Sequence, residues 1–474
     1  MTTTYAFQFD SAACSGCKAC QIACKDKNQL PAGIVWRRVY EISGGGWQKA
    51  GQTWKTDVFA YNLSMACNHC VHPKCAGVCP TNAYSVRPDG IVLLDEEKCI
   101  GCKYCAWACP YGAPQYDPVT GRISKCDLCC DHLDSGSLPA CVTSCPMRTL
   151  ELVEEAEPVT HTRGQSSVFP LPVDSNTGPR LVINPHPIAD RLADKTLANE
   201  EEIRPRKPGR FDELPLLVFT LLVQMAVGGF WAAEWMFSML RAQAEFYSPL
   251  LRGTPYLICG VLLGIGALAS LAHLGVKHRA WRALAHLRKS WLSREILFLG
   301  FFGAGCLLSL TPLPWQGGMI ARIMTALLGA VLVYCMAQVY HLHTVPSWDS
   351  WRTTVGFFVT ASLLGMLLMS NLLVTEAHFT GIQLTPLQFT HVGVLTMVLL
   401  AVQLVLVVSA RYPVPGTVFW MRIGLILAGL AGGTSLLLLP FLHSVRLIFP
   451  LFVLILGEEV IGRWCFYAAR HNPL

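Results

Sequence analysis

The chain has 474 residues, of which 52% are hydrophobic and only 14% are charged, and its net charge is +6. So small a charged fraction is unusual for a soluble protein and indicates a large apolar part. The basic excess lies from residue 214 onward, whereas the first 213 residues are slightly acidic. The positive charge therefore lies in the second half of the sequence. We expect no nucleic acid partner.

Sixteen of the 21 cysteines form four groups of four within the first 145 residues. The groups are Cys14, Cys17, Cys20 and Cys24; Cys67, Cys70, Cys75 and Cys79; Cys99, Cys102, Cys105 and Cys109; and Cys126, Cys129, Cys141 and Cys145. A C-x2-C-x2-C-x3-C run, as in the first and third groups, supplies thiolates to cubane iron–sulfur clusters. The four groups therefore predict four [4Fe–4S] clusters, in a domain over residues 1–153 that transfers single electrons.

Other uses of these cysteines fit less well. Disulfides need an oxidising compartment, and because no signal peptide opens the chain we expect none. Zinc ribbons combine two C-x2-C pairs across a longer stretch and lack the third cysteine of the run. Cys130 lies outside the four groups. A packed thiol beside a cluster is the favoured interpretation of Cys130, and replacement of Cys129 as a ligand is the alternative.

The second half of the sequence is organised as apolar stretches. Residues 154–213 are rich in proline and charge and predict a covering segment and a linker. Over residues 214–474, eight stretches reach the length of about 20 residues that a helix needs to cross a bilayer. They lie near 214–240, 254–276, 295–313, 320–341, 353–375, 387–410, 422–442 and 447–467. The expected fold class is an α+β tandem ferredoxin-like (poly-[4Fe–4S]) domain fused to an all-α bundle of eight transmembrane helices.

The distribution of basic residues predicts the orientation in the membrane. Eight crossings would place both termini on one side, which collects most of the lysines and arginines between the spans. The other side has only Arg241, Arg252, Arg322 and Arg446. The positive-inside rule then places the cluster domain in the cytoplasm, at the inner membrane of a bacterium. A basic collar that docks the cluster domain is the alternative interpretation.

Electrons also need a carrier in the membrane. No pattern of axial haem ligands is evident, so we expect a quinone, either ubiquinone or menaquinone. Helix parity puts His273 and Glu295, at the end of the second span and the start of the third, on the cluster side. Ionisable groups at membrane depth are costly and usually functional, and an imidazole suits proton exchange with a quinol. We therefore predict a quinone site at His273 and Glu295, with a merely interfacial position as the alternative.

Further ionisable residues compete for this role. Tyr340 and His341 end the fourth span on the cluster side and are second candidates for the quinone site. Glu459 and Arg463 are four residues apart in the last span. Because side chains at that spacing are neighbours on a helix, they predict a structural ion pair.

Both halves resemble subunits of one family. The first half resembles the iron–sulfur subunit of the dimethyl sulfoxide reductase family of molybdenum enzymes, and the second half resembles that family's separate eight-helix membrane anchor. The first resemblance rests on Cys14-Ser15-Gly16-Cys17-Lys18-Ala19-Cys20, Cys99-Ile100-Gly101-Cys102-Lys103-Tyr104-Cys105 and Lys125-Cys126-Asp127-Leu128-Cys129. The second rests on Glu213-Leu214-Pro215-Leu216, His273-Leu274-Gly275 and Thr344-Val345-Pro346-Ser347-Trp348. The protein thus resembles a fusion of two accessory subunits, joined near residues 203–213.

The resemblance implies how the cysteines are shared. Each group gives three ligands to one cluster and its last cysteine to a partner cluster. The implied sets are Cys14, Cys17, Cys20 and Cys145; Cys24, Cys126, Cys129 and Cys141; Cys67, Cys70, Cys75 and Cys109; and Cys79, Cys99, Cys102 and Cys105. Relatives such as respiratory nitrate reductase lack a cysteine at the position of Cys102, so its presence implies a four-iron cluster. The family also associates the residues matching His273 and Glu295 with the quinol site.

The resemblance further implies a separate catalytic subunit that carries molybdenum bis(pyranopterin guanine dinucleotide). Two directions of electron flow stay open. The partner could oxidise sulfite while the anchor reduces quinone, or the anchor could oxidise quinol while the partner reduces an S-oxide or N-oxide. The charge count favours the first, because the sulfite dehydrogenases of this superfamily face the cytoplasm. A redox sensor without turnover is a remote third hypothesis.

Overall fold

The computed structural model describes residues 4–155, 171, 176–189, 213–239, 249–311, 315–380, 386–409, 416–438 and 441–471. The chain divides into two compact units. Unit 1 comprises Met1–Lys207 together with Leu274–Ser290, and unit 2 comprises Pro208–His273 and Trp291–Leu474. Most of the predicted linker over 154–213, and the predicted joint near 203–213, lie outside the described residues.

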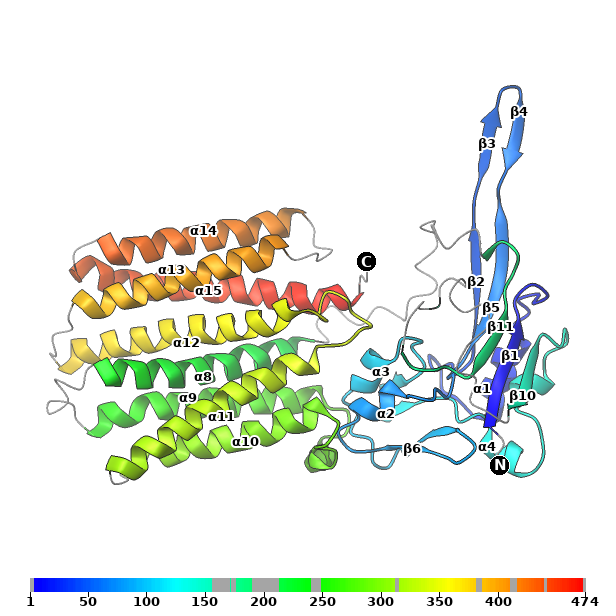
Figure 1. The fold of residues 1–474 in the computed structure, drawn as a ribbon, viewed down its shortest axis with the longest axis horizontal. Coiled ribbons are helices and arrows are strands. Elements are labelled where there is room, and N and C mark those ends of the chain that lie inside the picture. The colour runs from blue at the N-terminus through cyan, green and yellow to red at the C-terminus, as the bar shows by residue number, and fades with distance from the viewer. Residues whose placement is uncertain are drawn as a thin grey trace. The chain divides into compact units, whose positions relative to one another are not determined.

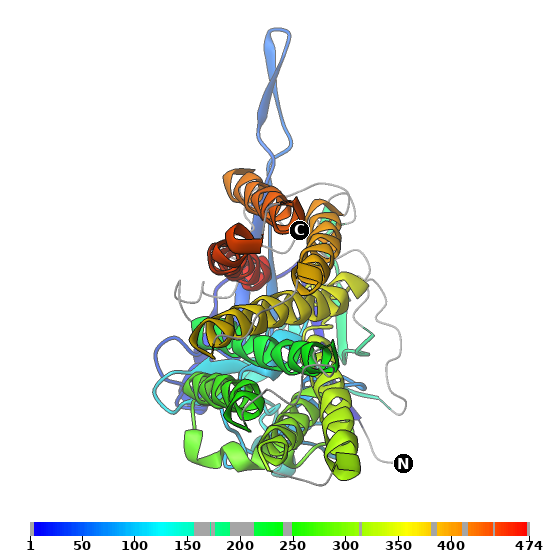
Figure 2. The same ribbon diagram turned by 90° about the vertical axis from the view of Figure 1, so that its left-hand side faces the viewer.

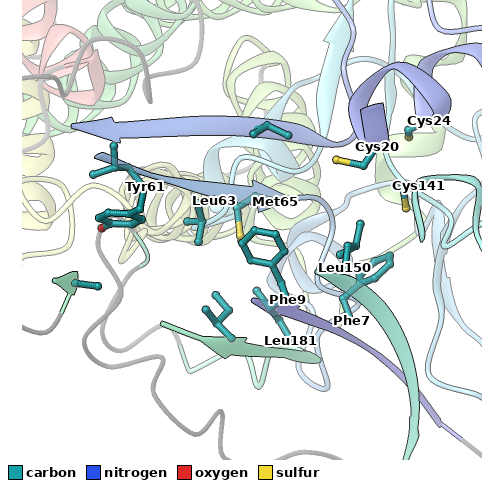
Figure 3. Close-up of a cluster of buried hydrophobic side chains, with 14 of the residues drawn as sticks. Phe7, Phe9, Cys20, Cys24, Tyr61, Leu63, Met65, Cys141, Leu150 and Leu181 are labelled. Carbon is teal, nitrogen blue, oxygen red and sulfur yellow. The ribbon is translucent and has the colours of Figure 1, made fainter. Parts of the chain in front are cut away.

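Unit 1 is built around a three-stranded sheet. Strand β1 (Thr4–Asp10) lies between β10 (Leu150–Glu155), which is antiparallel to it, and β11 (Leu181–Asn184), which is parallel to it. Alternate residues of a strand point to opposite faces, and Phe7 and Phe9 of β1 thereby enter one core. Figure 3 shows that Cys20, Cys24 and Cys141 lie at an edge of this core. The predicted cluster ligands are thus part of the packing of unit 1.

A long hairpin packs on the same core. Strands β2 (Arg38–Gly44) and β5 (Phe59–Met65) pair along their whole length, and the hairpin continues as β3 (Trp47–Ala50) and β4 (Thr53–Thr56). Figure 1 shows this continuation as an arm, and every residue in β3 and β4 is exposed. The register places Trp47 and Trp54 on one face of the arm. Unit 1 therefore presents two exposed tryptophans at the end of a two-stranded ribbon.

Short elements carry the cysteine groups. The helices are α1 (Ala19–Lys27), α2 (Lys74–Val78), α3 (Tyr104–Ala108), α4 (Cys130–Asp134) and α5 (Ala140–Thr143). Two small antiparallel hairpins lie between them, β6 (Tyr84–Val86) with β7 (Val92–Leu94), and β8 (Gln115–Asp117) with β9 (Arg122–Ser124). Such alternation of tiny sheets and helical turns fits the expected α+β class. All 21 cysteines lie in described residues, and no disulfide joins any of them in the structure.

Unit 2 is a bundle of long helices, seen nearly end-on in Figure 2. They are α8 (Leu214–Met239), α9 (Pro249–His273), α10 (Trp291–Ser309), α11 (Trp315–Val339), α12 (Trp351–Thr380), α13 (Pro386–Ser409), α14 (Gly416–Leu438) and α15 (Phe441–Ala468). Of the helices in the described parts, seven are long and apolar enough to cross a membrane. Helix α15 is not among them; it carries Arg446, Glu458, Glu459 and Arg463. Eight crossings therefore remain a prediction.

Helices α8 and α12 form the centre of the bundle. Their apolar windows are 78% and 61% buried, against 28% for α9 and α10. Gly228 of α8 packs directly on the backbone of Ala361, and Gly365 of α12 packs on the backbone of Gly228 and Gly229. A side chain at any of these glycines would force the two helices apart. Small residues at such contacts allow helix backbones to approach closely within a bilayer.

Candidate cluster and quinone sites

The structure brings the predicted ligand cysteines together in sets of four. One cavity of unit 1 is lined by Cys67, Cys70, Cys75 and Cys109; a second by Cys79, Cys99, Cys102 and Cys105; a third by Cys14, Cys17, Cys20 and Cys145. These are three of the four sets implied by the family resemblance. Four thiols around one cavity are the donor set that a cubane cluster requires, so the residues fit the group.

The fourth set is also assembled. Cys24 interacts electrostatically with Cys129 and Cys141, and Cys126 interacts with Cys24 and Cys141. The neighbours of Cys130 are instead Asp127, Arg87 and the acidic residues of α4, and its side chain packs against the core. Cys129 rather than Cys130 therefore faces the other thiols, as the favoured interpretation expected.

One backbone feature recurs in all four groups. The residue before the second cysteine has a positive φ: Gly16 (70°), His69 (42°), Gly101 (69°) and Leu128 (61°). The reversed turn directs amides at sulfur: the Gly101 N–H donates to Cys99 Sγ and the Leu128 N–H to Cys126 Sγ, both at 3.4 Å. Glycine adopts this conformation without steric cost, which explains its place in two of the groups.

Burial governs the chemistry of these thiols. Burial raises the pKa of Cys24, Cys70 and Cys102 to about 12 and that of Cys109 to about 11. Metal binding requires thiolates, so loading these sites releases protons and the metal charge has to stabilise the buried anions. Without that charge the thiols would remain protonated at neutral pH.

Arg37 lies buried among these cysteines and is the residue that the sequence interpretation missed. Its side chain is 1% exposed and its guanidinium lies 4.2 Å from the centre of the Phe7 ring. Nη1 donates to Ser64 Oγ at 3.2 Å, and Ser64 Oγ is 3.5 Å from Cys20 Sγ. Burial alone would lower the pKa of Arg37, but the surrounding Cys141, Cys126, Cys20 and Cys24 raise it. The negative charge opposite this cation would thus come from two cysteine sets in their thiolate form.

The segment between α9 and α10 belongs to unit 1. The Val276 N–H donates to the Ile100 carbonyl at 3.1 Å, Ser290 Oγ donates to the Val78 carbonyl at 2.8 Å, and His286 Nδ1 is 2.9 Å from the Cys79 carbonyl oxygen. Arg279 pairs with Glu97 at 2.7 Å. These contacts fix the segment to the loops that hold the Cys79, Cys99, Cys102 and Cys105 set. The sequence analysis placed the basic residues of this segment on one side of the spans, with a basic collar that docks the cluster domain as the alternative interpretation.

The predicted quinone residues lie at either end of this segment in the sequence. His273 is the last residue of α9, and Glu295 is the fifth residue of α10. Their side chains are 8% and 4% exposed, so neither is a freely hydrated interfacial group. Ionisable groups buried at membrane depth are costly and usually functional.

The second candidates have fixed partners. His341 is 3.3 Å from Asp349 and 3.0 Å from the Thr354 hydroxyl. The hydroxyls of Tyr340 and Tyr467 are 2.6 Å apart, within a cluster of aromatic rings that includes Trp348 and Phe466. Tyr340, which follows the end of α11, is therefore joined to Tyr467 near the end of α15, a relation that the sequence did not reveal.

Charged side chains inside the bundle pair differently from our expectation. Glu459 and Arg463 do not form the predicted ion pair. Instead Arg422 of α14 pairs with Glu458 at 2.7 Å, Arg463 donates to Gln224 of α8 at 2.8 Å, and Thr360 of α12 donates to Glu459 at 2.8 Å. The partners of these buried side chains thus come from neighbouring helices.

The two units match different families. Residues 209–469 match the family described as DMSO reductase anchor subunit (DmsC), and residues 58–155 match the 4Fe-4S dicluster domain. The iron–sulfur half is similar to one polypeptide of the anaerobic dimethyl sulfoxide reductase of Escherichia coli (strain K12), with 46% identity over 43% of this chain and 100% of the relative. The corresponding polypeptide of Haemophilus influenzae is 45% identical over 42% of this chain and 98% of the relative.

A further relative comes from a different reductase. One polypeptide of the tetrathionate reductase of Salmonella typhimurium is 41% identical over 30% of this chain and 54% of the relative. Together these similarities support iron–sulfur electron transfer and membrane anchoring within one polypeptide.

Proposed function

This protein belongs to the family of DMSO reductase anchor subunits, and its anchor is fused to an iron–sulfur subunit of the same reductase type. We propose that it relays electrons between membrane quinol and a separate catalytic subunit. The catalytic partner would carry molybdenum bis(pyranopterin guanine dinucleotide), and the relay would consist of four [4Fe–4S] clusters. The observation that carries this proposal is the assembly of four thiols around each of three cavities in unit 1.

The cysteine sets have defined roles in this proposal. Bound clusters would supply one-electron transfer, which no side chain of this protein provides. The protein holds the thiolates, excludes water from them and places Arg37 between two sets. Burial and nearby charge are the levers by which a protein adjusts cluster potentials.

We propose that quinol is oxidised at His273 and Glu295. Two protons leave the quinol hydroxyls for each pair of electrons, and a buried imidazole and a buried carboxylate are suited to accept them. Both residues are joined in sequence to the segment 274–290, which is hydrogen-bonded to the loops of the Cys79, Cys99, Cys102 and Cys105 set. The continuous chain thus links the proposed quinol residues to the surroundings of one cluster.

For the direction of flow we propose quinol oxidation with reduction of an S-oxide or N-oxide by the partner. The names of the relatives support a reductase, and none that we compared supports the sulfite oxidation favoured by the charge count. The test uses the complex purified through a C-terminal tag and assayed anaerobically. We expect dimethyl sulfoxide to oxidise a quinol analogue. Sulfite-dependent reduction of a quinone analogue, without the first reaction, would reverse the assignment.

Variants test the quinone residues. His273→Ala and Glu295→Gln should lower quinol oxidation by about 10²- to 10⁴-fold, the usual contribution of acid–base catalysis. Cluster content, measured by electron paramagnetic resonance, should stay unchanged. His343→Ala is the matched control, because His343 is 74% exposed, and Glu234→Gln is the second control, because Glu234 is paired with Arg322. Normal quinol turnover in His273→Ala would rule out the site.

Orientation is a separate proposal. The excess of basic residues on one side of the spans supports a cytoplasmic cluster domain at the inner membrane of a bacterium. Digestion of an N-terminal tag by protease in intact spheroplasts tests it. Protection is expected, whereas cleavage would place unit 1 outside the cytoplasm without affecting the assignment of electron flow.

A further inference from the structure

A cavity of unit 2 lies among α12, α13, α14 and α15, and neither His273 nor Glu295 lines it. Its polar lining comes from all four helices, with Thr360, Gln403, Arg422, Glu459 and Arg463. Phe357, Phe466, Leu406 and Val407 form its apolar walls. The site therefore combines aromatic surface with several polar side chains, which is the composition of a small-molecule pocket.

Two acceptors in this cavity have no hydrogen-bond partner. Glu459 is 3% exposed and Gln403 is 6% exposed. Within the part of the chain that the structure describes, the Glu459 Oε1 and Gln403 Oε1 atoms accept no hydrogen bond. Leaving a buried acceptor unpaired is costly, so two of them facing one cavity indicate an absent donor.

Among the described residues, no donor that lines the cavity forms a hydrogen bond with these two acceptors. Arg422 pairs with Glu458, Arg463 donates to Gln224, and Thr360 donates to the other oxygen of Glu459. Arg463 also lies 4.1 Å from the centre of the Phe357 ring. A ligand that satisfies both acceptors must therefore bring its own hydrogen-bond donors. A phosphodiester group brings only acceptors and cannot satisfy either atom.

We propose that this cavity binds a hydroquinone head group, as a second site in addition to the one at His273 and Glu295. One hydroxyl of the ring donates to Glu459 Oε1 and the other to Gln403 Oε1, while Phe357 and Phe466 contact the ring. A hydroquinone is the membrane-soluble compound class with a flat apolar body and two opposed hydroxyl donors. Binding of the hydroquinone at this second site does not depend on where electrons enter the clusters.

The position of the cavity suits a ligand from the lipid phase. It is lined by the first residues of α12, including Arg352 and Thr353, and by the last turns of α13 and α15. Trp351 and Trp420, which lie near the starts of α12 and α14, are 61% and 69% exposed. Exposed tryptophans at helix ends are typical of the interface between membrane and water, where quinol head groups partition.

The test counts binding sites on the complex with its catalytic partner in lipid nanodiscs. Reduced decylubiquinone is the probe, under anaerobic conditions without an oxidant, and its dimethyl ether is the control because it cannot donate hydrogen bonds. We expect two saturable sites in the unaltered protein, and one in His273→Ala. Gly356→Leu should also leave one, because an added Cβ there meets only Leu406, at 3.9 Å, and the side chain fills the cavity. The dimethyl ether should not bind at the second site.

Matched variants keep the outcome clear. Gly424→Leu adds the same side chain where nothing lies within 4 Å and should retain both sites. Glu459→Leu should weaken the second site by about tenfold or more through loss of an acceptor. Three results would each overturn the proposal. The unaltered protein could have a single site that His273→Ala abolishes. It could have two sites that Gly356→Leu leaves unchanged, or it could bind the dimethyl ether as well as the quinol. A phospholipid retained in native mass spectra and lost in Gly356→Leu would also overturn it. Loss of quinol turnover with the cavity site intact would concern only the proposed function.

Discussion

The two units bury positive charge by different means. In unit 2, Arg422 has a carboxylate partner at 2.7 Å, supplied by Glu458 of a neighbouring helix. In unit 1, Arg37 is buried more completely, but its hydrogen bonds go to Ser64 and the groups around it are cysteines. Two of its nitrogens, Nε and Nη2, have no partner within the described residues.

Arg422 thus has a counter-charge within the polypeptide, whereas Arg37 needs one that a cofactor provides. The bundle compensates Arg422 with its own Glu458, so this charge needs no cofactor. Thiols are neutral until they bind metal, so Arg37 gains a counter-charge only when the cysteine sets are loaded. Folding of unit 1 should therefore depend on iron, and folding of unit 2 should not.

Removal of the clusters should have the largest effect. Oxidative extraction of iron with a chelator leaves Cys20, Cys24 and Cys141 in the core without metal and Arg37 without a counter-charge. We expect residues 4–155 to become sensitive to trypsin, while helical circular dichroism from unit 2 persists. A mock extraction without oxidant is the control. A protease-resistant unit 1 after complete iron loss would contradict the comparison.

Loss of Glu458 should be the next largest effect. Glu458→Ala leaves Arg422 buried and uncompensated, which costs about 3–5 kcal/mol. Thermal unfolding followed by helical circular dichroism measures it. The double variant Arg422→Met/Glu458→Leu removes both charges and should recover most of the stability. Equal destabilisation by the single and double variants would show that the ion pair is not the cause.

Replacement of Arg37 tests the other side of the comparison. Arg37→Met should lower the reduction potentials of two clusters, because a nearby positive charge favours the reduced cluster. The expected shift is on the order of 100 mV. It corresponds to the Coulomb energy of unit charges roughly 6 Å apart at an effective dielectric constant of about 20. Arg37→Lys should retain much of the potential. Redox titration monitored by electron paramagnetic resonance gives the values. Unchanged potentials in Arg37→Met would assign the arginine a packing role on Phe7.

An exposed pair provides the smallest effect. Lys27 and Asp131 are 2.6 Å apart with side chains 18% and 60% exposed. Because solvent screens such pairs, Lys27→Met should change the free energy of unfolding by less than about 1 kcal/mol. Chemical denaturation of the loaded complex, compared at low and high salt, measures it. A change as large as that of Glu458→Ala would mean that exposure does not distinguish these charges.

Local spacing predicted most of the site. The four cysteine groups follow from residues three or four positions apart, and the resemblance supplied the sets that the structure then brings together. Helices α8 to α15 follow from continuous apolar stretches. The interaction predicted at positions 459 and 463 was wrong, because sequence spacing cannot include Arg422 and Gln224, which come from other helices.

The sequence by itself determined that this protein carries iron–sulfur cysteines and a membrane anchor, because both patterns repeat within short windows. Only the tertiary structure decided that residues 274–290 pack in unit 1, that Arg37 lies among two cysteine sets, and that Glu459 and Gln403 share a cavity. Each of these relations joins residues distant in sequence. Burial strengthens the interactions between their charges, because little solvent screens them. It also removes the water that would otherwise satisfy their polar atoms.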